Sequence, residues 1–345
     1  MVVVIGWDIG GAHLKGARVE AGQVTTAAQT ATPLWQGLDR LDAAFAALKQ
    51  QLGDADVHAV TMTGELCDAF ASRRDGVAGL AAIAARHLAP SAPRLYAGRA
   101  GFVPLGAALE HAGDIASANW HASAALVGLK LPDALLIDIG STTTDLIPVV
   151  AGKVAAIGST DAGRLEAGEL VYTGMARSFV MAMAARAPFD GRWTPLMNEY
   201  FASSADVHRI LGALPDGADK MASADGRDKT APASRVRLAR MIGREADEAD
   251  DRAWDALAAW FAEAQLRDIT DAAMLRLSRG DLRREAPVVA AGVGDRVVAE
   301  AARRLQRPCV GFSSLIDVRA GAAQAVSQCA PAAAVALLAA ADCGR

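Results

Sequence analysis

Short apolar runs alternate along this chain with longer stretches in which apolar residues recur at helical spacing. Buried strands are predicted at residues 57–62 and 134–139, where β-branched and aliphatic residues cluster. Amphipathic helices are predicted over 38–52 and 252–277, where apolar residues return every three or four positions. Residues 286–305 add the order strand, glycine turn, helix. This alternation of strands and helices predicts an α/β fold.

The hydrophobic pattern of the first residues returns later in the chain. The stretch "VVIGWDIGGAHLKGARVEAGQV" (3–24) aligns without a gap on "LLIDIGSTTTDLIPVVAGKV" (135–154), and every matched pair is 130 positions apart. The match places Asp8 on Asp138 and keeps register across some twenty residues. Such a register predicts a duplicated structural unit.

The repeat predicts two domains, one covering residues 1–130 and the other 131–345. Within the second, residues 187–280 are expected to form a polar, mainly helical insertion with long loops near its centre. Duplicated halves of this kind usually face each other across a cleft, so we expect a central cleft that binds the ligand.

Composition limits the class of partner. The chain is 52% hydrophobic and carries a formal net charge of −4, which argues against a general nucleic-acid or anionic-membrane surface. The four cysteines lack metal-ligand spacing, which predicts a reduced cytoplasmic protein. The start of the chain does not have the form of a signal peptide. The apolar run 330–341 is too short for a membrane span, so we expect a packed terminal helix or a homodimer contact.

Each copy of the repeat contains Asp-Ile-Gly followed by small or hydroxyl residues. Glycine permits unusual backbone angles, and consecutive amides at such a turn form an anion-binding nest. A third glycine turn lies at the start of a predicted helix, where amides also favour anions. The predicted phosphate-binding residues are Asp8, Gly10, Gly11, Lys15, Gly140, Ser141, Thr142, Thr143, Thr144, Gly292 and Gly294. The alternative is a tight hairpin turn in which aspartate caps backbone amides.

If the halves face each other, Asp8 and Asp138 both point into the cleft and would hold Mg²⁺ against phosphate oxygens. Neither turn is a Walker A loop, because GxxxxGK[ST] does not occur in the sequence. The late "AAGVGD" turn is not a full GxGxxG, which argues against a Rossmann dinucleotide site.

In this order, "WDIGGAHLK", "IDIGSTTTDL" and "VVAAGVGD" resemble the two phosphate motifs and the adenosine motif of the acetate kinase, sugar kinase, Hsp70 and actin superfamily. The resemblance spans almost the whole chain and implies a duplicated ribonuclease-H-like fold with two lobes around a central cleft. The third motif lacks the adjacent glycine pair common in adenosine loops, which argues against ATP as a cofactor.

Four further segments resemble a narrower family. "VTMTGELCDAF", "ASANWHASA", "VYTGMARS" and "MASADGRDKT" look like the hydantoinase/oxoprolinase-related proteins of tetrahydromethanopterin-linked one-carbon metabolism. The resemblance implies a transferase of methanofuran or methylofuran biosynthesis. It would join an aminomethylfuran-methyl diphosphate to the phenol of a tyramine or tyrosine, with or without glutamate, and release diphosphate.

The resemblance also suggests roles for single residues. Glu65 would take the phenol proton, while Lys15 and Asp138 would act on the leaving diphosphate. The alternative for Glu65 is a carboxylate that interacts with a helix dipole. Further residues from these segments would contact substrate, with a solvated loop or ordinary helix surface as the alternative: Asn119, His121, Arg164, Tyr172, Asp225 and Arg227.

Two other functional classes stay open from the sequence. One is an ATP-dependent small-molecule kinase or amidohydrolase of the same fold, although the chain is short for an oxoprolinase and its adenosine motif is incomplete. The other is a nucleotide switch without catalysis. That class would need a partner-binding surface or a peptide domain, and the sequence offers no segment for either.

Overall fold

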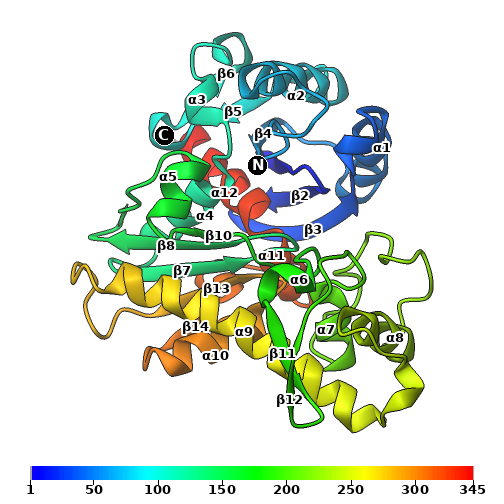
Figure 1. Cartoon of the computed structure of the whole chain (residues 1–345). Helices are drawn as coiled ribbons and strands as arrows, with labels where there is room; N and C mark the ends of the chain where they lie inside the picture. The colour runs from blue at the N-terminus through cyan, green and yellow to red at the C-terminus, as the bar shows by residue number, and fades with distance from the viewer. Residues whose placement is uncertain (1, 345) are drawn as a thin grey trace. The chain divides into compact units, whose positions relative to one another are not determined.

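The computed structural model describes residues 2–344, whose strands form two sheets and a separate hairpin. The first sheet has the order β3-β2-β1-β4-β5-β6, in which β1 pairs antiparallel with β2 and parallel with β4 (Figure 1). Its strands are β1 (Val3–Ile9), β2 (His13–Glu20), β3 (Gln23–Ala31), β4 (Val57–Met62), β5 (Arg94–Tyr96) and β6 (Phe102–Pro104). Residues 4–9 of β1 are all buried, as expected for a central strand covered on both faces.

The second sheet repeats this pairing. Its order is β10-β8-β7-β13-β14, and β9 pairs with β8. The strands are β7 (Ala134–Ile139), β8 (Thr144–Val150), β9 (Lys153–Val154), β10 (Leu170–Val171), β13 (Val288–Gly292) and β14 (Cys309–Gly311). The bounds of β4 and β7 are those that the apolar runs predict.

The predicted duplication is confirmed at the hairpin turns. The turn after β2 has positive φ at both central residues, Ala21 (50°) and Gly22 (82°). The turn after β8 has the same form at Ala151 (50°) and Gly152 (72°). Paired positive φ angles are what two-residue type I′ hairpins require, so the two copies share turn geometry as well as sequence.

Contacts divide the chain into two compact units. Unit 1 holds the residues up to Leu136, Ile147–Arg164 and the residues from Val310 onward, and unit 2 holds Ile137–Leu146 and Leu165–Cys309. The helices of unit 1 are α1 (Asp39–Leu52), α2 (Arg73–Leu88), α3 (Ala112–Ile115), α4 (Asn119–Gly128), α5 (Asp161–Glu166), α11 (Ala323–Gln328) and α12 (Ala330–Cys343). The division into ribonuclease-H-like lobes at residue 130 and the cleft between them stay predictions.

The apolar C-terminal run forms α12, which packs on β1, β2 and α4 within unit 1. Residues 330–336 and Ala339 are buried there, so the predicted packed terminal helix is confirmed. The homodimer contact suggested for this run stays a proposal.

The packing of α12 on β1 needs a glycine at position 6. A Cβ on Gly6 would lie 2.0 Å from the carbonyl oxygen of Ala332 and 2.7 Å from the amide nitrogen of Ala336. Both atoms belong to the helix backbone, so the clash cannot be relieved by turning a side chain. We therefore expect Gly6→Ala to lower the free energy of unfolding by about 3 kcal/mol.

Chemical denaturation of Gly6→Ala beside Gly113→Ala tests this contact. A Cβ on Gly113, in α3, meets nothing within 4 Å, so the control should leave stability almost unchanged. Equal midpoints for the two variants would contradict the close packing of α12 on β1.

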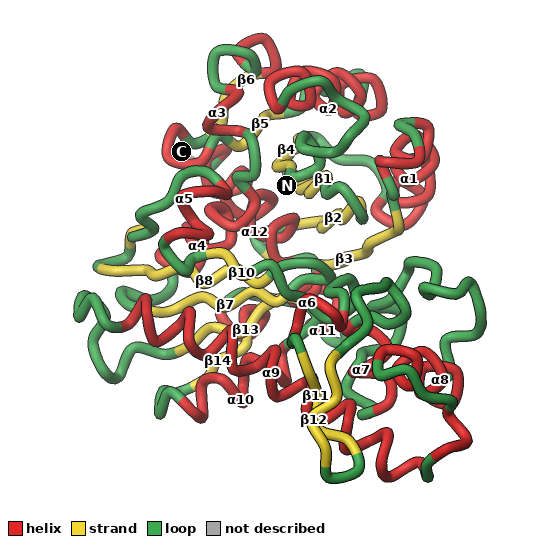
Figure 2. Tube along the Cα trace, viewed as in Figure 1, coloured by secondary structure: helices red, strands yellow, loops and turns green. Residues whose placement is uncertain are grey.

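Unit 2 contains the hairpin β11 (Arg186–Phe189) and β12 (Arg192–Pro195), followed by three helices beside it (Figure 2). Its helices are α6 (Val180–Met183), α7 (Ser204–Ile210), α8 (Ala231–Met241), α9 (Asp251–Leu277) and α10 (Asp295–Arg304). The helix predicted over 252–277 is confirmed as α9. The long loop expected near the centre of the insertion is confirmed at residues 211–230, and α7 and α8 on either side of it share a core with α9 that includes Val207, Leu238 and Phe261.

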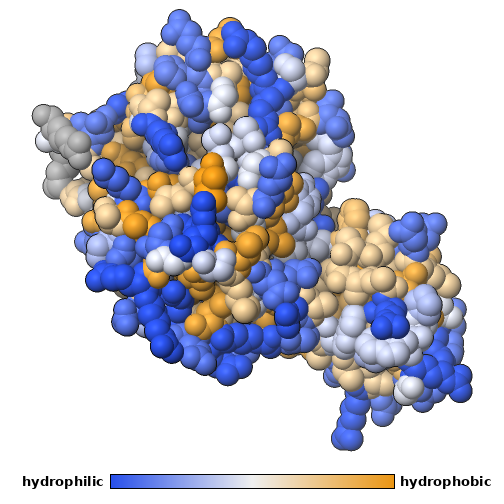
Figure 3. Space-filling view, turned by 60° about the vertical axis from the view of Figure 1, so that its left-hand side comes forward, coloured by the Kyte–Doolittle hydropathy of each residue, from blue (hydrophilic) through white to orange (hydrophobic). Residues whose placement is uncertain are grey.

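The face drawn in Figure 3 mixes hydrophilic and hydrophobic residues, which is ordinary for a folded protein surface. Within residues 2–344, none of the helices combines the length and apolar character needed to cross a bilayer. These residues include all four cysteines, and no disulfide forms among them.

Candidate active site

The Asp-Ile-Gly turns of the two copies have the same internal hydrogen bond. The amide of Gly10 donates to the carbonyl of His13 at 2.9 Å, and the amide of Gly140 donates to the carbonyl of Thr143 at 2.9 Å. Each turn is therefore a closed loop between two antiparallel strands. The sequence repeat extends to the backbone geometry of the predicted phosphate turns.

A second turn packs on each of these loops. In unit 1 the two amides of Thr63–Gly64 donate to the carbonyl of Ile9 at 2.9 and 3.0 Å. In unit 2 the two amides of Val293–Gly294 donate to the carbonyl of Ile139 at 2.8 and 3.2 Å. The "TGEL" turn and the late "GVGD" turn are thus counterparts, a relation that the sequence analysis missed.

Glycines permit this close packing. A Cβ on Gly64 would lie 3.2 Å from the backbone of Gly10, and a Cβ on Gly292 would lie 2.2 Å from the carbonyl oxygen of Ile139. The Gly292 position also faces Asp138, whose Oδ1 would be 2.4 Å from the added carbon. Close packing of strand and turn therefore explains the glycine at position 292.

The first phosphate turn brings a carboxylate and an ammonium group together. Asp8 pairs with Lys15 across β1 and β2, and Lys15 Nζ lies 4.0 Å from Asp8 Oδ2. Asp8 is buried, while the Lys15 side chain keeps about a fifth of its surface exposed. Lys15 is therefore placed where a bound anion and Asp8 could share its charge. Gly11 lies at the same turn, with its backbone against Gly64.

The second turn presents only part of its predicted hydroxyl set. Ser141, Thr142 and Thr143 are partly exposed, and Ser141 Oγ and Thr142 Oγ1 lie 3.4 Å apart. Thr144 is fully buried, and its hydroxyl donates to the carbonyl of Thr173 at 2.7 Å. The expectation that Thr144 offers its hydroxyl to phosphate is wrong, because β8 already begins there and uses the group internally.

Asp8 and Asp138, each considered by itself, could be a ligand of a hard cation. Asp138 is 8% exposed, and its Oδ1 packs closely on Gly292, where an added Cβ would lie 2.4 Å away. Asp8 is 3% exposed at the matched strand end of the other unit. Carboxylate oxygens are the ligands that Mg²⁺ prefers. Within the described residues, groups of three or more His, Cys, Asp or Glu side chains placed to hold a metal do not occur.

Glu65 is the most enclosed acid near the first turn. Its residue is 1% exposed, Oε1 accepts a hydrogen bond from Ser117 at 2.8 Å, and Oε2 has no hydrogen-bond partner among the described residues. The first turn of α2 packs closely on the backbone of Glu65, since a Cβ on Gly76 would lie 2.2 Å from the Glu65 carbonyl oxygen. Burial raises the pKa of Glu65 above its ordinary value of 4.5. A carboxyl group of raised pKa and fixed position suits general acid–base chemistry.

Ser117 holds this carboxylate from a strained backbone position. It lies between α3 and α4 with a φ of 52°, a left-handed angle that residues with a side chain rarely adopt. Its Oγ also lies 3.4 Å from Asp161 Oδ2. Strain of this kind is retained where the surrounding structure enforces it, often at active sites. The sequence analysis missed Ser117, and its position inside the quoted "ASANWHASA" segment is the only sequence signal for it.

An arginine completes the cluster. Arg73 Nε lies 3.9 Å from Glu65 Oε1, and Arg73 Nη2 donates to Asp161 at 2.7 Å. Arg164 is 2% exposed, with its guanidinium 4.3 Å from the centre of the Trp120 ring and its Nη1 3.9 Å from Asp161. The structure therefore joins Glu65 and Arg164, which the sequence proposed separately, into one charged group in unit 1.

The two other predicted residues of α4 have local partners. Asn119 is partly exposed, and its Oδ1 accepts from the amide of Trp120 at 2.7 Å. His121 is hydrogen bonded through Nδ1 to the hydroxyl of Tyr96 at 2.8 Å, and burial lowers its pKa to about 4. His121 is thus neutral near neutral pH and acts as a structural partner of Tyr96.

Tyr172 and Arg227 lie in unit 2. Tyr172 is 71% exposed, and Arg227 is exposed in the loop before α8. Asp225, two residues before Arg227, points inward instead, because Arg237 Nη1 donates to its Oδ1 at 3.1 Å. Asp225 is therefore an anchor of this loop.

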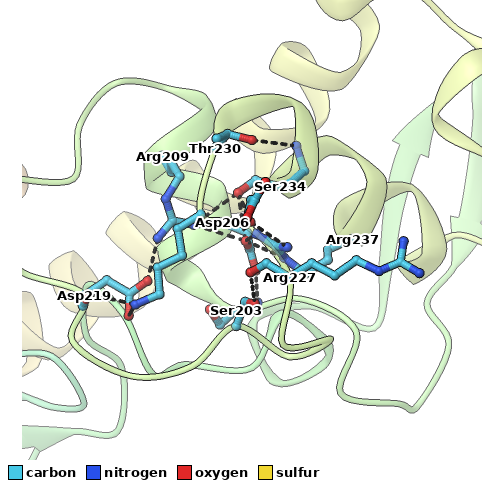
Figure 4. Close-up of polar contacts among 12 residues, drawn as sticks. Ser203, Asp206, Arg209, Asp219, Arg227, Thr230, Ser234 and Arg237 are labelled. Atoms are coloured by element: carbon cyan, nitrogen blue, oxygen red, sulfur yellow. Dashed lines mark hydrogen bonds and ion pairs between the residues drawn. The ribbon is translucent and has the colours of Figure 1, made fainter.

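Arg237 belongs to a buried ionic cluster centred on Asp206 (Figure 4). Asp206 Oδ1 accepts from Arg237 at 2.9 Å, from Ser234 at 2.8 Å and from Arg209 at 3.2 Å. The Arg237 side chain is 0% exposed and that of Asp206 is 3% exposed. This cluster joins α7, α8 and the loop between them, and it explains why a polar stretch of sequence folds compactly.

The chain matches the family model described as hydantoinase/oxoprolinase over residues 56–340. The chain belongs to the hydantoinase/oxoprolinase family. The matched range includes the Glu65 turn, the second phosphate turn and the Asp206 cluster. Family membership therefore covers both units.

Two relatives carry the name (4-{4-[2-(γ-L-glutamylamino)ethyl]phenoxymethyl}furan-2-yl)methanamine synthase. The protein of Methanocaldococcus jannaschii is 32% identical over 243 residues, which cover 70% of this chain and 72% of that protein. The protein of Methanococcus vannielii is 33% identical over 110 residues, which cover 32% of this chain and 49% of that protein.

Solved structures establish the fold class of this family member. The component A of (R)-2-hydroxyglutaryl-CoA dehydratase from Acidaminococcus fermentans superposes with a TM-score of 0.50 at 12% identity and covers the whole of both chains. Acetone carboxylase superposes with a TM-score of 0.57 at 12% identity, covering 96% of this chain and 70% of that one. The predicted actin/Hsp70/sugar-kinase fold class is confirmed.

The raised pKa of Glu65 predicts how stability depends on pH. Above this pKa the folded protein holds a buried carboxylate whose charge burial disfavours, and below pH 4.5 the group is neutral in both states. The destabilisation due to Glu65 is therefore absent at acid pH and appears as pH rises. We expect the stability of Glu65→Gln relative to the wild type to increase from pH 4.5 toward neutrality.

Urea unfolding of both proteins at several pH values measures that difference. A difference that stays flat or shrinks with rising pH would show that burial does not raise the pKa of Glu65. Glu110→Gln, which alters an exposed glutamate of the same unit, provides the comparison expected to show no trend.

Proposed function

We propose that this chain is a transferase of methanofuran or methylofuran biosynthesis. The similarity to two synthases named for a phenoxymethyl-furan product supports a transferase role in that pathway. The product name contains an ether between a furan-methyl carbon and a phenol oxygen. An aminomethylfuran-methyl diphosphate and a tyramine or tyrosine phenol are the substrates from which such an ether can form.

The proposed step breaks the carbon–oxygen bond between the furan-methyl carbon and diphosphate. The phenol oxygen forms the new bond to that carbon, diphosphate leaves with the electron pair, and the phenol proton goes to Glu65. The furan oxygen stabilises positive charge that develops on the carbon, so neutralising the leaving group and placing the phenol are the tasks left to the protein.

The single observation that carries this assignment is the environment of Glu65. Its carboxylate is buried, held at one oxygen by Ser117, and raised in pKa. The other oxygen is without a hydrogen-bond partner among the described residues, as a base that must accept a proton requires. The Ser117 hydroxyl lies between Glu65 and the partly exposed carboxylate of Asp161. We propose that the proton leaves Glu65 along these groups.

We propose that each of the two phosphate turns, taken by itself, binds phosphate oxygens. Lys15 supplies a positive charge at the first turn, and Ser141, Thr142 and Thr143 supply partly exposed hydroxyl groups at the second. Asp8 at the first turn and Asp138 at the second are each proposed as a carboxylate ligand for Mg²⁺, which would neutralise phosphate charge. We place the reaction in the cytoplasm, in one-carbon metabolism linked to tetrahydromethanopterin, where reducing conditions suit cysteines that form no disulfide.

A transfer assay tests the proposal. The purified chain is mixed with Mg²⁺, aminomethylfuran-methyl diphosphate, and tyramine, tyrosine or their glutamyl forms, with and without ATP. We expect diphosphate release without ATP and a new aryl ether by mass spectrometry. ADP formation without ether would instead favour the ATP-dependent kinase or amidohydrolase class.

A further inference from the structure

A segment that the proposed mechanism does not use packs against the second phosphate turn of unit 2. The three consecutive amides of Met175–Arg177 donate to the carbonyls of Gly140 and Ser141 at 2.8–3.0 Å. A Cβ on the preceding Gly174 would lie 2.5 Å from the amide nitrogen of Thr142. The backbone of this segment is therefore fixed against the turn, and the side chain of Arg177 starts beside it.

The guanidinium of Arg177 lies at the hydroxyl edge of the turn. Its Nη1 donates to Thr142 Oγ1 at 3.3 Å, and the residue is only partly buried. The planar guanidinium group is the side chain best suited to two-point contact with phosphate oxygens. A diphosphate held at the exposed hydroxyls of this turn would lie next to that charge.

An exposed aromatic pair includes Phe179, which lies two residues after Arg177 in the sequence. The rings of Phe179 and Tyr200 have centroids 4.4 Å apart, and each residue is 42% exposed. A backbone bridge between Phe179 and Ser203 brings these segments together. Burial lowers the pKa of the Arg177 guanidinium, and the charges of Tyr172 and Tyr200 oppose that shift. Arg177 and Phe179 are thus two residues apart on one segment, whose backbone is fixed against the second phosphate turn of unit 2.

We propose that Arg177 binds the leaving diphosphate and that the Phe179–Tyr200 pair binds the aromatic ring attached to it. The inference rests on the proposed function and deepens it. In an arylmethyl diphosphate one methylene separates ring and phosphate, so a cation and an aromatic face placed side by side can contact both ends. Stacking would shield the ring from water and direct its methylene carbon toward the acceptor.

Calorimetric titration with two probes separates the roles. The probes are inorganic diphosphate and aminomethylfuran-methyl diphosphate, each with Mg²⁺ and without acceptor. Arg177→Met should weaken both by about 10- to 100-fold, because a charge-assisted contact is lost. Arg192→Met, at an exposed arginine of the same unit, should leave both within about twofold of the wild type.

Phe179→Leu and Tyr200→Leu should weaken the furan-bearing probe by about three- to tenfold, while inorganic diphosphate binds as to the wild type. Unchanged diphosphate affinity in Arg177→Met, or equal weakening of both probes in the leucine variants, would overturn the inference. Unfolding curves show whether each variant is folded. Failure of the transfer reaction alone would refute the proposed function but not this site, because both titrations are read without turnover.

Discussion

Glu65→Gln should retain the fold and lose most of its transferase activity. If Glu65 takes the phenol proton, its replacement by an amide removes general-base catalysis, which is worth about 10²- to 10⁴-fold in rate. The amide keeps the size of the side chain and an oxygen that can accept the hydrogen bond from Ser117. The expected loss is therefore in kcat, with little change in the apparent affinity for the diphosphate substrate.

The control is Glu110→Gln, which makes the same chemical change at an exposed position of unit 1 and should keep wild-type turnover. A phenol of lower pKa offers a second check, because an acceptor that ionises more readily depends less on a base. Glu65→Gln should recover part of its activity with such a phenol. Wild-type kcat in Glu65→Gln would exclude Glu65 as the base and would favour the alternative, a carboxylate that interacts with a helix dipole.

Asp206→Asn should be the most destabilising single substitution in unit 2. Its carboxylate neutralises Arg237, whose side chain is 0% exposed, and also accepts from Ser234 and Arg209. Removing the Asp206 charge leaves buried Arg237 with Asp225 as its remaining acidic partner, and breaking a buried ion pair costs up to about 3–5 kcal/mol. Because the Asp206 carboxylate also accepts from the amide of Ser203, the Phe179–Tyr200 pair should be loosened as well.

A matched substitution at the surface distinguishes the effect of burial on the free energy of unfolding from the effect of losing a charge. Asp271→Asn breaks an ion pair with Arg267 at 2.8 Å, but both side chains are at least half exposed. An exposed pair four residues apart in a helix contributes only about 0.3–0.5 kcal/mol. Equal loss of unfolding free energy in the two variants would contradict the account of Asp206 as the centre of unit 2.

Sequence periodicity located most of the framework because local forces determine it. The strands β4 and β7 are mostly apolar runs that end at glycine turns, so their bounds follow from the local sequence. The repeat across residues 3–24 and 135–154 survives because both copies need the same hairpin geometry, including positive φ at Gly22 and Gly152.

Polar helices were harder to predict. In α7 and α8 the charged side chains of Asp206 and Arg237 point inward and satisfy each other, so an alternation of apolar and polar positions does not mark the buried face. Residues 211–230, which contain glycine and proline, form the expected long loop, and α7 and α8 lie on either side of it in the sequence. The helices form because ionic contacts distant in sequence replace part of the apolar core.

The candidate site depends on contacts that no local pattern contains. Ser117 meets Glu65 across 52 positions and meets Asp161 across 44. The counterpart relation between the Glu65 turn and the late glycine turn was also hidden, because they share only a glycine followed by an acid and the insertion separates them. Tertiary hydrogen bonds to Ile9 and Ile139 make the relation visible.

One isotope experiment tests the central claim most directly. The acceptor phenol is labelled with ¹⁸O, the reaction is run with aminomethylfuran-methyl diphosphate, and both products are analysed by mass spectrometry. Displacement of diphosphate at carbon predicts that all of the label lies in the aryl ether and that the released diphosphate is unlabelled. Label bonded to phosphorus, in a phenyl phosphate or diphosphate product, would mean attack on phosphorus and would contradict the proposed transferase.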